Sequence, residues 1–252
     1  MLVRDFMGLI DELAPFETAL HDNVGLLVGG LDMPVTGVMI ALDVTQAVIH
    51  QMRERGANLL ITHHPLMYAP THSIRTDTYE GRLITSLITC GYAFICAHTN
   101  LDQAPSGVND VLAGTLMLKS ISGEGLYRMG RLEPSCEAHE ARKAFEKVLA
   151  APVRLYGDAH KRISTVLASA GAGSEFWEEA LRQEADAFLT GEMKHHDILG
   201  AVGQGLAVFE AGHFATENPA MDALALALQM RLDALKLNVT VCRPSVKSFP
   251  IL

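Results

Sequence analysis

Short apolar runs alternate with amphipathic segments along much of the chain. The runs GVMIALDV (residues 37–44) and NLLITHH (residues 58–64) are mostly apolar until their last positions, which predicts two buried strands. Between them, TQAVIHQMRERGA has apolar residues at helical spacing, and Thr45 is a suitable N-cap. Strands that alternate with helices in this way are typical of βαβ units around a largely parallel sheet. The pattern therefore predicts an α/β fold.

The alternation of strand and helix patterns continues to about residue 102, and a mixed, charged region follows in the middle of the chain. A helix is predicted at residues 79–91, and a third strand in YAFICAHTNLD, residues 92–102, which ends in a polar cluster. Residues 123–160 are mixed and charged, and they predict a short connection followed by an exposed helix. We therefore expect a first half over residues 1–122 and a second half over residues 123–252.

The second half repeats the order of elements of the first. RISTVLASAG (162–171) predicts a strand, SEFWEEALRQEA a helix capped by Ser174, and DAFLTGEMKHHDIL a strand that ends in a second His-His pair. LAVFEAGHFATE (206–217) then occupies the place of AFICAHTNLD, and NVTVC (238–242) predicts a late strand. Few residues coincide, but the shared pattern favours an internal duplication into two similar halves with mostly parallel sheets.

Composition and charge narrow the classes of partner. About half of the 252 residues are apolar (49%), enough for a sizeable core. A formal net charge of −9, with no basic run, argues against a nucleic-acid partner. No run reaches the roughly 20 apolar residues of a membrane span, and acidic residues interrupt the opening segment, so we expect a cytoplasmic protein without a membrane partner. The four cysteines lack CxxC spacing, which favours reduced, structural thiols.

Eight side chains with metal-binding chemistry stand at predicted strand ends. In parallel α/β sheets, ligands bind beyond the carboxyl ends of the strands, so these side chains are expected along one rim. Histidine is the commonest metal ligand, and imidazoles together with carboxylates suit Zn, Fe, Mn or Co better than Mg or Ca. The eight residues are His63, His64, His98, Asp102, His195, His196, His213 and Glu217.

The adjacent histidines His63 and His64 predict two metal ions rather than one. Successive side chains of a strand point to opposite faces, so the pair cannot readily chelate a single ion while the backbone stays extended. Pro65 favours an extended His64, which would hold the pair in a divergent arrangement. Two ions about 3.5–4 Å apart repel each other and need anionic ligands, for which Asp102 and Glu217 are the candidates.

The spacing between histidines and carboxylates supports Asp102, His213 and Glu217 as further metal ligands. His98 and Asp102 are four residues apart, as are His213 and Glu217, and the second pair shares one face if a helix begins there. Gly212 would let the backbone come close at this point. We therefore interpret five residues as metal ligands: His63, His64, Asp102, His213 and Glu217.

The roles of His98, His195 and His196 stay open. They are candidates for ligands, for hydrogen-bond partners that orient the ligands, or for acid–base groups. The last two roles are favoured, because five protein ligands leave open positions for water. Asp43 also ends a predicted strand on this rim, where it belongs to the site or caps the following helix.

Six segments together carry a family resemblance. They are HDNVGLLVG, ALDVT, ITHHPLMY, AHTNLD, TGEMKHHD and EAGHFATE. In their order and separations, over nearly the whole chain, the sequence resembles the GTP cyclohydrolase I type 2 homologs, also called Ngg-interacting factor three-like proteins. Where that family usually has Trp before the Asp-Asn pair and Ser after it, this chain has His21 and Val24, so the role of this segment is left open.

The resemblance implies both an architecture and a metal site. The architecture is two intertwined α/β/α halves, assembled into a toroidal homohexamer. The site is a dinuclear divalent-metal centre in which Glu217 bridges the ions, and its ligands are His63, His64, Asp102, His213 and Glu217.

The resemblance also suggests a reaction. It implies a metal-dependent hydrolase for a nucleotide or purine-like substrate. In such a reaction, we expect His98, His195 or His196 to carry the proton. No P-loop is present to bind a triphosphate. The alternative is a non-catalytic metal-binding, metal-delivery or regulatory scaffold protein, since the same ligands would serve it. A dinuclear phosphoesterase of the Asp-His-His type ranks third, because Thr62 stands where its aspartate would be.

Overall fold

The chain folds into two compact units, which the computed structural model describes over residues 1–245. The first unit comprises residues 1–105 and the chain from Met221 onward, and the second comprises residues 106–220. From the sequence, a single boundary between residues 122 and 123 was expected. The difference arises because the segment just before residue 123 is a strand that pairs within the sheet of the second unit, while the last strand of the chain pairs within the first.

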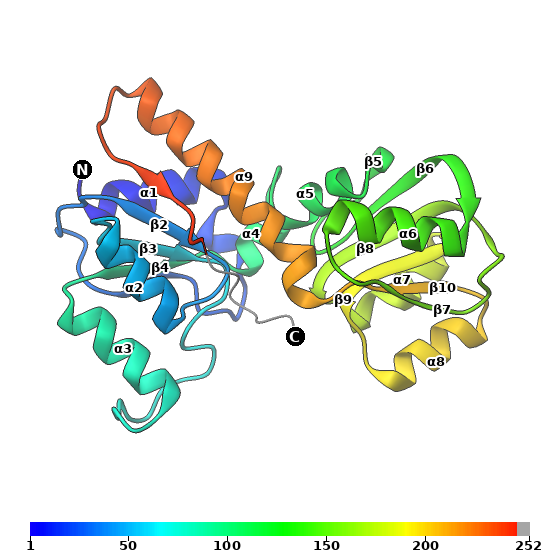
Figure 1. Ribbon diagram of the computed structural model, residues 1–252, viewed down its shortest axis with the longest axis horizontal. Coiled ribbons are helices and arrows are strands. Elements are labelled where there is room, and N and C mark those ends of the chain that lie inside the picture. Colours follow the sequence, from blue (N-terminus) through cyan, green and yellow to red (C-terminus); the bar gives the residue numbers. More distant parts are fainter. Residues whose placement is uncertain (246–252) are drawn as a thin grey trace. The chain divides into compact units, whose positions relative to one another are not determined.

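The first unit contains, among the described residues, a five-stranded sheet of order β1-β4-β3-β2-β11. Its strands pair in parallel except for β1, and β2, β3 and β4 are buried along their whole length. Figure 1 shows helices on both faces of this sheet. The elements are α1 (Val3–Leu13), the 3-10 helix η1 (Phe16–Thr18), β1 (Gly25–Val28), β2 (Val38–Ala41), α2 (Gln46–Glu54), β3 (Leu59–Thr62), α3 (Tyr79–Thr89), β4 (Ala93–Cys96), α4 (Thr99–Gln103) and β11 (Val241–Cys242).

The predicted βαβ pattern explains this first sheet. Thr45 caps α2 as expected, because its side chain accepts a hydrogen bond from the Val48 N–H at 3.2 Å. The apolar stripes of α2 and α3 bury Met52 and Leu83 against Phe94 of β4. Strands covered on both faces read as continuous apolar runs, which is the signal seen in the sequence.

The second unit contains, in the described part of the chain, a six-stranded sheet of order β5-β6-β8-β9-β10-β7. Its centre, β8-β9-β10, is parallel, and the pairings that flank this centre are antiparallel. The elements are α5 (Val108–Thr115), β5 (Lys119–Ser122), β6 (Arg128–Glu137), α6 (Ala138–Leu149), β7 (Arg154–Tyr156), β8 (Arg162–Ala172), the 3-10 helix η2 (Ser174–Phe176), α7 (Trp177–Arg182), β9 (Ala187–Glu192), α8 (His195–Gly203) and β10 (Ala207–Glu210).

Helices cover both faces of the second sheet as well (Figure 1). The neighbours Phe188 and Leu189 on β9 belong to opposite clusters, as the alternation of a strand requires. Phe188 packs with Ile198 of α8, and Leu189 packs in the cluster that holds Phe145 of α6. The predicted α/β class with two similar halves is therefore confirmed. The boundary between the units at residues 220 and 221 falls inside the long helix α9 (His213–Ala234).

Three local expectations for the second half were wrong. The charged region contains the ten-residue strand β6, which lacks a clear apolar alternation because much of it is exposed or half-buried. Ser174 does not cap α7: the cap position is Phe176, and the Ser174 hydroxyl accepts a hydrogen bond from the Lys194 N–H at 2.7 Å. The second His-His pair does not end a strand, because β9 stops at Glu192 and His195 opens α8.

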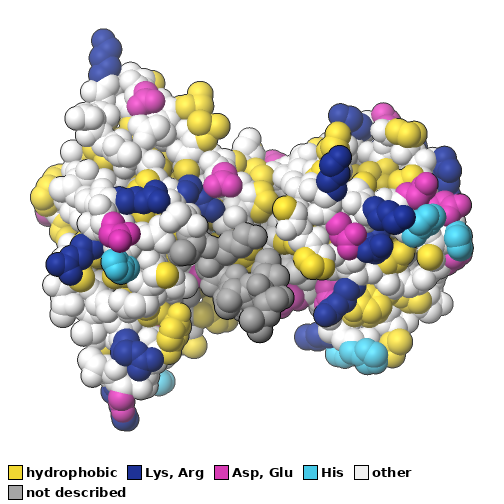
Figure 2. All heavy atoms as spheres, in the orientation of Figure 1, with side chains coloured by type: hydrophobic (Ala, Val, Ile, Leu, Met, Phe, Trp, Pro, Cys, Tyr) yellow, Lys and Arg dark blue, Asp and Glu magenta, His cyan; other side chains and the backbone are white. Residues whose placement is uncertain are grey.

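Composition also led us to expect reduced cysteines, no basic surface for nucleic acid and no membrane span. All four cysteines are free in the structure, and only Cys90 is exposed. Figure 2 shows Lys and Arg side chains scattered among acidic ones on the face drawn. In the described residues, every helix is too short or too polar to cross a membrane.

Candidate metal centre

Three histidines of the first unit lie where its parallel strands end. His63 and His64 follow β3 directly, and His98 follows β4 by two residues, at the N-cap position of α4. Because β3 and β4 are parallel neighbours, their carboxyl ends meet at the same edge of the sheet. One possible ligand atom from each of the three imidazoles lies within 4.8 Å of the others. The expected gathering of donors at a sheet rim is therefore found in this unit.

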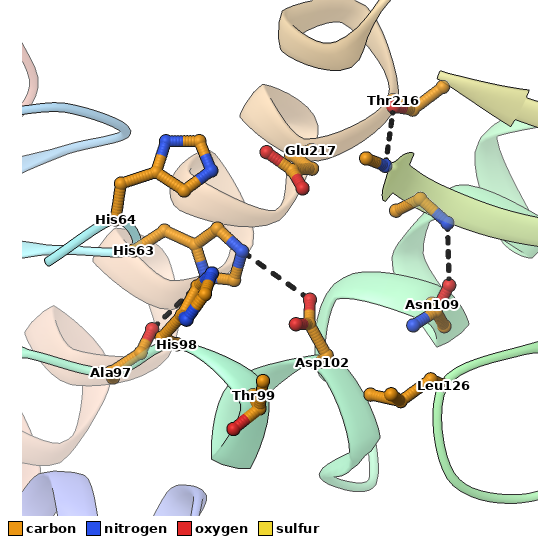
Figure 3. Close-up of polar contacts among 12 residues, drawn as sticks. His63, His64, Ala97, His98, Thr99, Asp102, Asn109, Leu126, Thr216 and Glu217 are labelled. Carbon is orange, nitrogen blue, oxygen red and sulfur yellow. Dashed lines mark hydrogen bonds and ion pairs between the residues drawn. The ribbon is translucent and has the colours of Figure 1, made fainter. Parts of the chain in front are cut away.

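The three imidazoles are oriented by oxygen atoms behind them. His63 Nδ1 lies 3.0 Å from the carbonyl oxygen of Ala97, as Figure 3 shows. His64 Nδ1 lies 2.7 Å from Asp43 Oδ1, and His98 Nδ1 lies 2.7 Å from Asp22 Oδ2. An acceptor at Nδ1 favours the tautomer that donates from this atom, so the lone pair is left on Nε2. This arrangement is typical of histidines that bind metal ions.

The two adjacent histidines lie close to each other beyond the end of β3. Their ring centroids are 5.0 Å apart and their planes are inclined by 48°. That each imidazole serves a different ion stays a prediction. Each ring is also close to His98, at centroid distances of 5.0 Å and 5.7 Å.

Asp102 adds a carboxylate to the same group. The segment HTNLD forms a helical turn, with the Asp102 N–H donating to the carbonyl oxygen of His98 at 3.0 Å. The carboxylate, however, faces His63: its Oδ1 lies 3.4 Å from His63 Nε2 (Figure 3). Two ligand atoms on one tetrahedral ion with bonds of about 2.0–2.2 Å are about 3.3–3.6 Å apart, so this spacing fits a metal ion.

Asp22 is a site residue that the sequence did not single out. Its Oδ2 accepts hydrogen bonds from the Thr99 N–H and hydroxyl as well as facing His98. Burial alone would raise the pKa of Asp22, but these hydrogen bonds and His98 hold it below the ordinary value. For His98, burial and the nearby His63 lower the pKa more than Asp22 raises it. The signal was present in HDNVGLLVG, where the segment's role was left open.

Asp43 is assigned by the structure to one of its two expected roles. Thr45 caps α2, so the helix does not need Asp43 for this purpose. The Asp43 carboxylate instead orients His64. Cys96, which ends β4, is not a candidate ligand: its thiol is buried, contacts the carbonyl oxygen of His63 at 3.1 Å, and has its pKa raised by burial.

The second unit carries its own pair of donors at the start of α9. The helix begins at His213, as the spacing predicted, and His213 Nε2 lies 3.1 Å from Glu217 Oε2 one turn later. Glu217 is almost fully buried, with 4% of its surface exposed. Gly212 has a φ of +85°, and an added methyl group there would meet nothing within 4 Å. It is therefore needed for the turn before the helix and not, as expected, for a close approach.

Close approach occurs at Gly171 instead. A Cβ atom at this position would overlap Glu217 Oε1 and lie 3.2 Å from His213 Nε2. The Gly171 N–H donates to the Thr216 hydroxyl at 3.1 Å, which ties the end of β8 to α9. The backbone of β8 thus leaves the space in which His213 Nε2 and Glu217 Oε2 face each other, 3.1 Å apart.

The pair His195–His196 differs from these donors in its exposure to solvent and in its neighbours. Both side chains are exposed at the start of α8. His196 Nε2 lies 3.4 Å from Asp197 Oδ1. Among residues 1–245, neither histidine belongs to a group of three or more His, Cys, Asp or Glu side chains that could hold one metal ion.

The donor set selects a class of metal. Imidazole nitrogens with one or two carboxylates suit Zn, Fe, Mn or Co, whereas Mg and Ca prefer oxygen-only shells. Both units therefore carry side chains that could hold such an ion.

The chain is similar to known proteins over nearly its whole length. The sequence model of the family Duf34/NIF3 (NGG1p interacting factor 3) matches residues 1–250. The chain belongs to this family. A GTP cyclohydrolase 1 type 2 homolog of Clostridium acetobutylicum is 31% identical over 251 residues, which cover 95% of this chain and 94% of the relative. A protein of the same name from Streptomyces coelicolor is 35% identical and covers 86% of this chain and 82% of its own length.

A solved structure extends the comparison to the fold. A Staphylococcus aureus hypothetical protein of this fold aligns with a TM-score of 0.95 and 30% sequence identity. The alignment covers 100% of this chain and 99% of that protein. The resemblance read from the six sequence motifs is therefore confirmed at the level of the family.

Proposed function

We propose that the protein is a metal-dependent hydrolase with a dinuclear centre, acting on a nucleotide or purine-like substrate. The observation that carries the proposal is the set of imidazoles in the first unit whose Nδ1 atoms each face an oxygen acceptor, which leaves Nε2 for a metal ion or a proton. The name of the Clostridium and Streptomyces relatives supports the substrate class.

The donors of the two units complement each other chemically. The first unit supplies imidazoles and Asp102, and the second supplies His213 and Glu217. Either group alone offers little negative charge to offset the repulsion between two divalent ions. We therefore propose that both groups would hold one centre, in which the Glu217 carboxylate would offset the repulsion between the ions. The proposed ligands are His63, His64, Asp102, His213 and Glu217.

Divalent ions at such a centre supply an activated water and polarise the substrate. The chain's own contribution is to orient the ligands and to carry the proton. His98 is suited to the second task, because Asp22 orients its Nδ1 and leaves Nε2 to exchange a proton. The acid–base role expected for His195 and His196 stays a prediction: alanine variants of either should keep their metal and lose turnover.

Metal loading followed by a substrate screen tests the proposal. The protein would be loaded separately with Zn, Fe, Mn and Co and offered nucleotides, purines and phosphoesters. Glu217→Gln keeps the size of the side chain but removes its charge, so it should hold at most one ion tightly and should lose turnover. His50→Ala is the matched control, since His50 is an exposed histidine of α2 paired with Glu54.

Two outcomes would overturn parts of the proposal. Metal that exchanges readily without turnover in any loaded form would favour the alternative, a non-catalytic metal-binding or metal-delivery protein. Wild-type protein that never exceeds one ion per chain would refute the dinuclear centre.

We also propose a homohexamer, which rests on the family resemblance. Light scattering at micromolar concentration should give the mass of six chains. A stable monomer would contradict it.

A further inference from the structure

A second group of metal-binding side chains lies in the second unit and shares no residue with those described above. It consists of Glu137, His139 and His160, which each offer one donor atom within 4.8 Å of the others. Figure 2 shows histidine side chains gathered beside acidic ones at the right edge of the face drawn. No feature of the proposed hydrolase uses this group.

Both histidines face one carboxylate oxygen. His160 Nδ1 lies 2.8 Å from Glu137 Oε2, and His139 Nδ1 lies 3.2 Å from the same atom. The two ring centroids are 5.6 Å apart. Zinc would replace the protons that the Nδ1 atoms share with this carboxylate. Ligand atoms on a tetrahedral ion with bonds of about 2.0–2.2 Å are about 3.3–3.6 Å apart, so small side-chain movements would bring all three groups onto one ion. The hydrogen bond from His160 holds the pKa of Glu137 below its ordinary value, which keeps the carboxylate ionised.

The backbone holds the three residues in place. Glu137 ends β6 opposite Arg162 in the antiparallel pair with β8. Beyond it, the Ala138 N–H donates to the carbonyl oxygen of Lys161 at 2.9 Å, and the His139 N–H donates to that of Ala159 at 3.0 Å. The strand–helix junction and the turn before β8 are thus joined by a ladder of hydrogen bonds. Ligands on such a scaffold lose little freedom when an ion binds.

The site is open to solvent. The side chain of His160 is 78% exposed, and those of Glu137 and His139 are 39% and 38% exposed. An ion can therefore reach the group directly, and positions not filled by protein stay available to water. Two imidazoles and one carboxylate with an open position are a donor set that suits Zn²⁺.

The geometry points to a separate, single-ion transition-metal site at Glu137, His139 and His160, which takes Zn²⁺ from solution and links the end of β6 to the turn before β8. It is independent of the proposed hydrolase, because it shares no residue with that centre. A bound ion would stabilise the folded second unit, and this stabilisation would rise with the logarithm of the zinc concentration once that exceeds the dissociation constant.

Zinc titration of matched variants tests this site. Zinc per chain would be measured after equilibration at a series of free zinc concentrations for wild type, for the double variant H139A/H160A and for H50A. His50 is the control, because it is an exposed histidine whose Nδ1 lies 3.8 Å from a single carboxylate, that of Glu54. None of the substituted side chains belongs to the proposed hydrolase centre, so the number of ions bound there should be the same in all three proteins.

At saturating zinc, the double variant should hold one ion fewer than wild type and H50A. His160→Ala alone should weaken this ion at least about tenfold, since loss of even an outer partner of a ligand has an effect of this size. In crystals soaked with zinc, anomalous scattering should show a peak between the three side chains. Equal zinc content of wild type and double variant, or no peak at this position, would overturn the proposal.

Discussion

The two His-His pairs of the chain have the same dipeptide and opposite environments. His63 is fully buried, and both it and His64 have an oxygen acceptor at Nδ1. His196 has 77% of its side chain exposed, and the pair 195–196 opens a helix instead of ending a strand. The first pair is suited to metal binding because Asp43, just after β2, and Ala97, just after β4, orient its rings. Two adjacent histidines are therefore not sufficient for a metal site. The hydrogen-bond acceptors at Nδ1 determine whether the rings are held ready to bind an ion.

The largest difference should appear in metal binding. Either His63→Ala or His64→Ala removes a proposed ligand and should weaken at least one ion by more than about 100-fold, beyond the 10–100-fold that follows loss of an outer hydrogen-bond partner. His195→Ala and His196→Ala should leave the metal content unchanged. Elemental analysis after dialysis would compare the four variants. Loss of metal in either His195→Ala or His196→Ala would contradict the prediction, because it would make the exposed pair metal ligands as well.

A smaller difference should follow when only the acceptor is changed. Asp43→Asn keeps the size of the side chain but removes the charge that orients His64, so metal affinity should fall about 10–100-fold. Asp197→Asn is the matched control, since Asp197 lies beside His196. Competition with a chelator of known affinity would measure both variants. Equal affinities would show that the acceptor behind His64 does not matter.

The smallest difference concerns the stability of the metal-free protein. His63→Ala leaves the buried carbonyl oxygen of Ala97 without the imidazole donor, which should lower the free energy of unfolding by about 1–3 kcal/mol. His195→Ala changes an exposed residue and should stay within about 0.5 kcal/mol of wild type. Urea unfolding with a chelator present would compare the two variants. A metal-free H63A protein as stable as wild type would mean that the imidazole is held only by the ion.

The fold could be predicted where local pattern and tertiary environment agree. The strands that became β2, β3 and β4 are covered on both faces, so their burial is visible as continuous apolar runs. β6 was missed because an exposed, antiparallel flanking strand has no such run. The division between the units could not be read locally, since it depends on the pairing of β11 with β2, which lies far away in the sequence.

For the candidate site, donors were easier to predict than their orientation. Spacing correctly predicted a helix that begins at His213 and brings Glu217 beside it. It could not reveal that Asp22, distant in sequence, orients His98, because this contact depends on the tertiary fold.

The edge position of β11 has a consequence for the order of folding during synthesis. Residues 106–220 form a contiguous unit that is complete in the growing chain before β11 has been made. The first sheet, although most of it is synthesised earlier, lacks the partner of β2 until Val241 and Cys242 emerge. Until then, β2 has an unpaired edge of the kind that other chains can join. The unit whose synthesis begins first is thus the last to be finished, and a ribosome that stalls near the end would leave that edge exposed.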